Sequence, residues 1–187
     1  MIRPLDTSEI DAYLAHADRQ GRENGRGATL RFALRPPSAP RDLERIRRVL
    51  ETGLTVTVGK PGWCRLWIDD GQLEIRGSVG LRAHSEQLAF HRALIDIGVL
   101  EPYRRAGVAT ALMQTAIAWA ANQPQLAWLD SEIFAHNEPA LRLHARLGFV
   151  EAGRVTDMFR LDGAPTDDVR LVLDLARNPQ EGPSLPR

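Results

Sequence analysis

A short segment rich in small side chains, residues 104–110, has the composition of a loop that could bind a phosphate. It reads Arg-Arg-Ala-Gly-Val-Ala-Thr. Small side chains let several backbone N–H groups point at one spot, and a helix that starts there adds the partial positive charge of its dipole. An anionic phosphate is the ligand that such a loop favours. The alternative from these residues alone is a tight strand-to-helix turn with two solvated arginines.

The elements on either side of the loop would hold it in place. Residues 93–99 form an apolar run, Ala-Leu-Ile-Asp-Ile-Gly-Val, with the length and β-branching of a strand. After the loop, apolar residues recur at helical spacing up to Trp119, and Pro124 predicts that this helix ends near Asn122. A strand, a loop and a helix in direct succession therefore position the phosphate-binding groups.

Two common phosphate loops do not match this segment. A nucleoside-triphosphate loop requires a lysine followed by Ser or Thr after its last glycine, and residues 104–110 contain no lysine. A dinucleotide loop requires three spaced glycines, whereas Gly107 is the only glycine of the segment. A phosphate-loop nucleotide binder is therefore disfavoured.

A second segment, residues 129–149, carries a family resemblance. It reads Leu-Asp-Ser-Glu-Ile-Phe-Ala-His-Asn-Glu-Pro-Ala-Leu-Arg-Leu-His-Ala-Arg-Leu-Gly-Phe. This segment resembles the later signature of the GNAT superfamily of N-acetyltransferases, and residues 104–109 resemble its pyrophosphate loop, Gln/Arg-x-x-Gly-x-Gly/Ala. The two motifs stand in the family's order and at its usual separation. The resemblance covers the chain from about Trp67 to Leu175 and implies acetyl-CoA as cosubstrate.

The resemblance also implies which residues bind coenzyme A. Strand residues before the loop would bind the pantetheine arm through backbone groups, and Gly98 fits a bulge or a close backbone approach there. Asn137 is a good helix N-cap, and the resemblance places its side chain on the same arm. The loop amides would bind the pyrophosphate, with charge added by the two arginines. The expected set is Ile97, Gly98, Val99, Arg104, Arg105, Ala106, Gly107, Val108, Ala109, Thr110 and Asn137.

Two carboxylates are candidates for the base that takes the proton of an acceptor amine. Glu132 lies five residues before Asn137, where some family members that acetylate protein N-termini place a catalytic glutamate. Asp96 interrupts the apolar strand, and a buried Asp there needs polar partners, so a structural role is the alternative. We rank Glu132 narrowly above Asp96.

His144 stands where the family usually has a tyrosine that protonates the departing thiolate. It lies seven residues beyond Asn137, so both residues face one side of the helix. Histidine is a workable acid near neutrality, although it is shorter than tyrosine. The alternative is a surface histidine without a catalytic role.

Composition excludes several other classes of protein. The chain has 24 Lys plus Arg and 24 Asp plus Glu, which is unlike the basic footprint of a nucleic-acid binder. Its one cysteine, Cys64, and five scattered histidines show no metal-ligand spacing, so we expect no metal. Neither a signal sequence nor a run of membrane length is present, and a cytoplasmic location is expected.

The remaining chain predicts the rest of the fold. Helices are expected after Asp6 and after Asp42, a polar loop over residues 19–27, and an edge strand or an extended segment over 29–34. Asp70-Gly71 predicts a hairpin, and Asp162-Gly163 a second one. The expected class is α+β, often filed as α/β in three layers, with one mixed and mostly antiparallel sheet and helices on both faces. Residues 1–175 would form one domain and 176–187 a disordered tail.

These observations predict an N-acetyltransferase that moves an acetyl group from acetyl-CoA to a primary amine by direct attack in a ternary complex. The acceptor is open among small amines, amino acids, antibiotics and protein N-termini. The alternative is an acyl-CoA-binding or sensing module without turnover, suggested by the missing tyrosine. Family habit allows a homodimer, which no stretch of the chain indicates.

Overall fold

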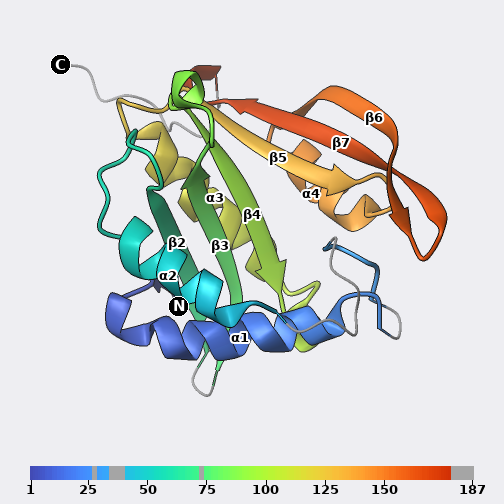
Figure 1. Ribbon diagram of the computed structural model, residues 1–187, viewed down its shortest axis with the longest axis horizontal. Helices are drawn as coiled ribbons and strands as arrows, with labels where there is room; N and C mark the ends of the chain where they lie inside the picture. Colours follow the sequence, from blue (N-terminus) through green and yellow to red (C-terminus); the bar gives the residue numbers. More distant parts are fainter. Residues whose placement is uncertain (27–28, 34–40, 72–73, 178–187) are drawn as a thin grey trace.

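The computed structural model describes residues 1–26, 29–33, 41–71 and 74–177. The described strands form one sheet in the order β1-β2-β3-β4-β5-β7-β6 (Figure 1). Every neighbouring pair in it is antiparallel except β4 and β5, which are parallel. The strands are β1 (Ile2–Pro4), β2 (Cys64–Asp70), β3 (Ile75–Ala83), β4 (Arg92–Val99), β5 (Trp128–Phe134), β6 (Val150–Leu161) and β7 (Ala164–Asp174).

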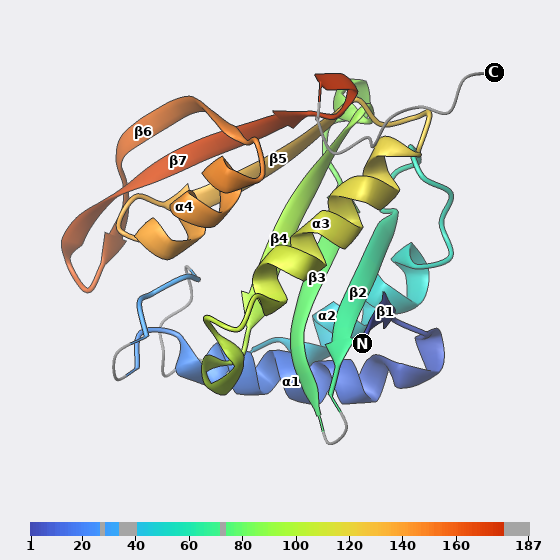
Figure 2. The same ribbon diagram turned by 180° about the vertical axis from the view of Figure 1, so that it is seen from behind.

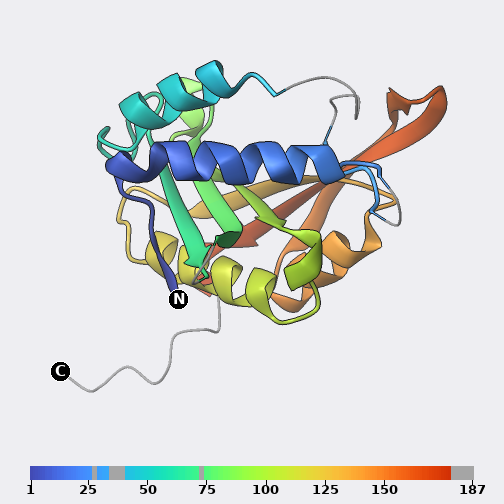
Figure 3. The same ribbon diagram turned by 90° about the horizontal axis from the view of Figure 1, so that it is seen from below.

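Helices cover both faces of this sheet, as expected. Helices α1 (Ile10–Glu23) and α2 (Leu43–Gly53) lie on one face, and α3 (Val108–Ala121) and α4 (Glu138–Arg146) lie on the other (Figure 3). Each face has its own apolar core: Leu112, Met113 and Ala116 of α3 contact the first, and Ile10 and Leu14 of α1 contact the second. The expected α+β class is confirmed.

The strands β4 and β5 pair only at their beginnings. The parallel ladder runs from Arg92–Trp128 to Leu94–Asp130 and ends there. Beyond these pairs the two strands diverge (Figures 1 and 2). Backbone groups on the β5 side of residues 95–99 therefore have no strand partner.

Several local expectations were wrong in their bounds. Helix α1 continues through residues 19–23, where a loop was expected, because Gly21 is buried and Arg22 pairs with Asp18 one helical turn earlier. Residues 29–33 form no strand, so the edge-strand alternative is wrong, and Leu34 lies outside the described residues. The hairpin at Asp70-Gly71 is longer than a two-residue turn, since Asp70 pairs with Ile75.

Gly98 is not at a bulge. The register between β3 and β4 is continuous from Gly77–Val99 to Ala83–Ala93. Glycine fits there for a different reason: a Cβ at this position would overlap the side-chain amide of Gln20, which lies against the strand. The close approach is therefore made by a side chain of α1.

Candidate active site

A cavity of about 960 Å³ lies between the end of β4, where this strand has left β5, the start of α3, and α4. All the residues expected to bind the cofactor line it except Ala106. Five further groups of lining residues were not expected from the sequence, and most of them come from α1, from residues 29–32 or from α4. They are Gln20; Thr29, Leu30 and Phe32; Tyr103; Pro139 and Ala140; and Arg142, Leu143, Ala145 and Arg146.

The start of α3 points free backbone donors into this cavity. Gly107 is the N-cap residue, with φ of 82°, and no side chain caps the helix. The first intrahelical bond runs from the Ala111 N–H to the Gly107 carbonyl, so the preceding N–H groups have no helical partner. Val108, Ala109 and Thr110, which carry these N–H groups, are among the residues that line the cavity. An anion there would satisfy the donors and the helix dipole together.

The two arginines of the loop differ in role. Arg104 donates from Nε to the Val99 carbonyl at 2.9 Å, from one terminal nitrogen to Thr29 Oγ1 at 3.0 Å, and from the other to Glu23 Oε2 at 2.5 Å. Its guanidinium is therefore occupied by protein groups. Arg105 and Arg146 also line the cavity, are exposed, and make no ion pair within the described chain. They are the cations available to a phosphate.

Asn137 caps α4, as expected. Its Oδ1 accepts a hydrogen bond from the Ala140 N–H at 3.3 Å. Its Nδ2 makes no hydrogen bond within the described residues, and the residue lines the cavity. The cap role is confirmed, and contact with a pantetheine arm stays a prediction.

His144 lies behind the cavity wall, inside the core. Its ring is 1% exposed, packs edge-on to Phe149 with centroids 4.9 Å apart, and does not line the cavity. Nδ1 donates to the Ala140 carbonyl at 2.9 Å, which leaves Nε2 as the bare nitrogen of the neutral ring, without a partner in the described chain. Burial lowers the pKa of His144, and the Ala140 bond opposes this only in part. The ring is therefore neutral near pH 7.

Both candidate bases lie on the face of the sheet that α1 and α2 cover. In β4, Asp96 alternates with Ile95, which is buried in the core under α3; in β5, Glu132 alternates with Ile133 in the same core. Both carboxylates are exposed to water and make no hydrogen bond within the described chain. Neither lines the cavity, but Asp96 immediately precedes Ile97 and Gly98, which do.

The pKa of Asp96 is raised. Desolvation by the surrounding protein is the main cause, and the positive charges of Arg82 and Arg41 act in the opposite direction. The residue is exposed to water, so the desolvation of its carboxylate by the surrounding protein is incomplete. A carboxylate with a raised pKa is a stronger base than an ordinary one.

The described residues contain neither a candidate metal site nor a helix that could span a membrane. No group of three or more His, Cys, Asp and Glu side chains there could hold a metal ion. None of the helices in the same residues has the length and apolar character needed to cross a bilayer.

The mixed seven-stranded sheet with helices on both faces defines the α+β fold, and sequence comparison identifies the family. Residues 32–149 match the model of the acetyltransferase (GNAT) family, and the chain belongs to it. A relative from Bacillus subtilis (strain 168), described as the uncharacterized N-acetyltransferase YycN, is 26% identical over 153 residues, which span 81% of this chain and 92% of the relative.

Two solved structures share the fold. An acetyltransferase of the GNAT family from Streptococcus pneumoniae has a TM-score of 0.79 at 18% identity, over 93% of this chain and 98% of that one. The structure of yncA, a putative acetyltransferase from Salmonella typhimurium with its cofactor acetyl-CoA, has a TM-score of 0.77 at 14% identity, over 100% of this chain and 97% of that one. At such identities the likeness establishes the fold.

Proposed function

We propose that this protein transfers the acetyl group of acetyl-CoA to a primary amine in a ternary complex. The observation that carries the proposal is the uncapped start of α3, whose first residues line a cavity beside the end of β4, where this strand has left β5. Membership of the GNAT family supports the reaction class. The Salmonella typhimurium structure, solved with acetyl-CoA, supports the choice of donor.

The residues of the cavity fit the parts of this donor. Its pyrophosphate would lie against the amides of residues 105–110, with charge from Arg105 and Arg146. Its amide-containing arm would lie along residues 97–99, where the backbone groups facing β5 lack strand partners, and near the free amide of Asn137. When bound there, acetyl-CoA supplies a thioester whose C–S bond breaks as the amine nitrogen bonds to the acetyl carbon, releasing amide and free thiol.

Asp96 is the base that we favour, which reverses the sequence-based ranking. It adjoins the strand segment that lines the cavity, and its raised pKa suits removal of a proton from an ammonium group. Glu132 lies on the same face and is the rival. We give His144 no proton-transfer role, because its neutral ring already donates its only N–H to Ala140.

Thermal unfolding with and without acetyl-CoA, with ATP and NAD as controls, tests the donor. A ligand that binds only the folded state adds about 2.7 kcal/mol of stability at a hundredfold excess over its dissociation constant. We expect the midpoint to rise with acetyl-CoA alone, and thiol to be released when an amine is added. A midpoint unchanged by acetyl-CoA would contradict the proposal. Binding without thiol release from any amine would identify an acyl-CoA-binding module instead.

A further inference from the structure

Two opposite charges, those of Arg82 and Asp96, lie on the face of the sheet that α1 and α2 cover, and neither has an ion-pair partner within the described chain. In the β3–β4 ladder Gly80 is opposite Asp96, and Arg82 is opposite Leu94. Arg82 is also opposite Cys64 of β2, whose side chain lies in the core under α1 and α2. Directly opposite residues share a face, so Arg82 and Asp96 both project toward the side of these helices.

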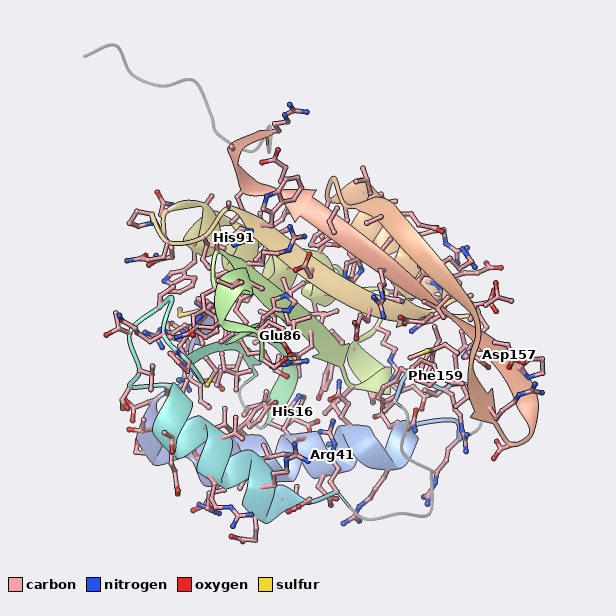
Figure 4. The ribbon with its side chains drawn as sticks, turned by 45° about the horizontal axis from the view of Figure 1, so that its top comes forward. His16, Arg41, Glu86, His91, Asp157 and Phe159 are labelled. Atoms are coloured by element: carbon pink, nitrogen blue, oxygen red, sulfur yellow. The ribbon has the colours of Figure 1, made fainter. Side chains whose placement is uncertain are left out.

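A third charge reaches the same place from the start of α2. Arg41 donates to the Ala17 carbonyl of α1 at 2.8 Å, which holds its side chain beside α1 (Figure 4). The positive charges of Arg41 and Arg82 both act on the Asp96 carboxyl, so the three groups are close enough to interact. We call these three residues the charge trio.

The trio is not a structural ion pair. Asp96 and Arg82 are exposed to water, and neither makes a hydrogen bond or an ion pair within the described chain. Gly80 lies beneath the Asp96 carboxylate, because a Cβ at residue 80 would be 2.9 Å from Oδ1. Charges that are near one another but unpaired can each be satisfied by a ligand that carries both signs.

We propose that the charge trio selects an acceptor amine that carries its own carboxylate, of the amino-acid type. The ammonium group of the acceptor lies toward Asp96, and its carboxylate toward Arg82 and Arg41. The trio holds two positive charges and one negative charge, so it attracts a zwitterion and repels a polyamine. This inference rests on the proposed function, since Asp96 is the base of that reaction.

A substrate panel on the intact protein tests the inference without any substitution. The panel contains the common L-amino acids, the amines left when their carboxylate is removed, and spermidine, each with acetyl-CoA and read by thiol release. We expect at least one amino acid to exceed its own decarboxylated amine by tenfold or more in kcat/KM, and spermidine to be poor. A preference for the decarboxylated amines or for spermidine would overturn the inference.

Substitution of Arg82 supplies the second test. Arg82→Gln should raise KM for the preferred amino acid at least tenfold and should not lower kcat/KM for the decarboxylated amine, which carries no carboxylate for Arg82 to bind. Arg48→Gln, an exposed arginine on α2, is the matched control and should change neither value. Equal losses for both kinds of substrate in Arg82→Gln would contradict the trio. If Arg82→Gln does not fold, Arg41→Gln answers the same question with the same expected result.

Failure of this inference differs from failure of the proposed function. If acetyl-CoA does not shift the thermal midpoint, the donor assignment fails. If acetyl-CoA binds and amines are acetylated without preference for a carboxylate, the function stands and the charge trio is overturned. Calorimetric titration of the preferred amino acid into protein saturated with coenzyme A gives a readout without turnover, and Arg82→Gln should weaken that binding at least tenfold.

Discussion

Two residues near the cavity, Asp96 and Gly107, occupy environments that lower the stability of the folded state. Asp96 is held where desolvation raises its pKa, although an Asn of the same shape would carry no charge to desolvate. Gly107, the N-cap residue of α3, has a φ of 82°, a backbone conformation that residues other than glycine rarely adopt. Both residues adjoin the proposed donor cavity, where such local costs are common.

Asp96→Asn should make the protein more stable and less active. The folded state holds the Asp96 proton more tightly than the unfolded chain, so this group's stability contribution is complete below its ordinary pKa of 3.8 and is lost as pH rises through the raised value. Asn should therefore raise the thermal midpoint at neutral pH, and the gain should shrink toward about pH 4.

The same substitution should lower kcat by roughly 10²-fold and remove the acidic limb of the pH–rate profile. Glu132→Gln is the comparison and should leave that limb in place. The measurements are thermal melts and initial rates across pH. A large loss of rate in Glu132→Gln with normal rates in Asp96→Asn would return the base to Glu132.

Gly107→Glu should abolish binding of acetyl-CoA. A carboxylate beside the amides of α3 would repel the pyrophosphate, and the left-handed backbone adds about 1–2 kcal/mol of strain. Gly163→Glu is the matched control, because the φ of Gly163 is 83° and a Cβ there would also meet open space. Both variants should lose similar stability, and calorimetric titration should show loss of binding in Gly107→Glu alone. If both variants lose acetyl-CoA binding, or if both keep it, the assignment of the loop as the pyrophosphate site would be contradicted.

Among the elements, one ion pair ties α1 to the loop that follows β4. Glu23 at the end of α1 accepts from Arg104 and from the backbone N–H of Glu101, at 3.1 Å for each of its oxygens. The Glu23 side chain is 14% exposed, so its charge is partly desolvated. Helix α1, which also covers Gly98 with Gln20, therefore holds both the loop and the strand that line the cavity.

Arg104→Gln should destabilise the protein by about 1–3 kcal/mol, because it removes three hydrogen bonds from a charged donor. Arg142→Gln is the control: its surface pair with Glu138 is worth about 0.5 kcal/mol or less. Denaturant unfolding of both variants measures the difference. Acetyl-CoA affinity should fall in Arg104→Gln through a looser loop. Equal stability of the two variants would mean that the three hydrogen bonds of Arg104 contribute nothing measurable.

At the scale of the whole molecule, β4 and β5 diverge beyond their short parallel ladder, and we propose that the ligand binds at this divergence. Beyond Leu94 and Asp130, the backbone groups of β4 and β5 that face the other of these two strands lose that partner, and a bound ligand can replace it. The β6–β7 hairpin is at the other edge of β5, where its ladder with β5 is complete from Trp128 to Phe134. Ligand effects should therefore be local to one side of β5.

Hydrogen exchange gives the corresponding prediction. Saturating acetyl-CoA should slow amide exchange at residues 97–99 and 105–110 at least tenfold, and leave β7 unchanged apart from any global stabilisation. Exchange measured by mass spectrometry with and without ligand provides the test. Uniform slowing throughout the sheet would show that the ligand acts only on global unfolding and would remove the evidence for this opening as its site.

The amino-acid sequence by itself determined the loop, the helix that follows it and the cap at Asn137. These features depend on residues close together in the chain: small residues before Val108, Pro124 after the helix, and an Asn before Pro139. The family resemblance extended this local pattern to a fold, and the α+β class and the GNAT family followed correctly from it.

Only the tertiary structure decided which side chains are free to act. Arg104 is occupied by Glu23, which lies 81 residues earlier, and His144 is turned into the core against Phe149. Gly98 is a glycine because Gln20 packs on it, and Asp96 gains its raised pKa from the protein around it. Side-chain contacts and desolvation depend on residues that are far apart in the sequence. The spacing of residues along the chain therefore cannot predict them.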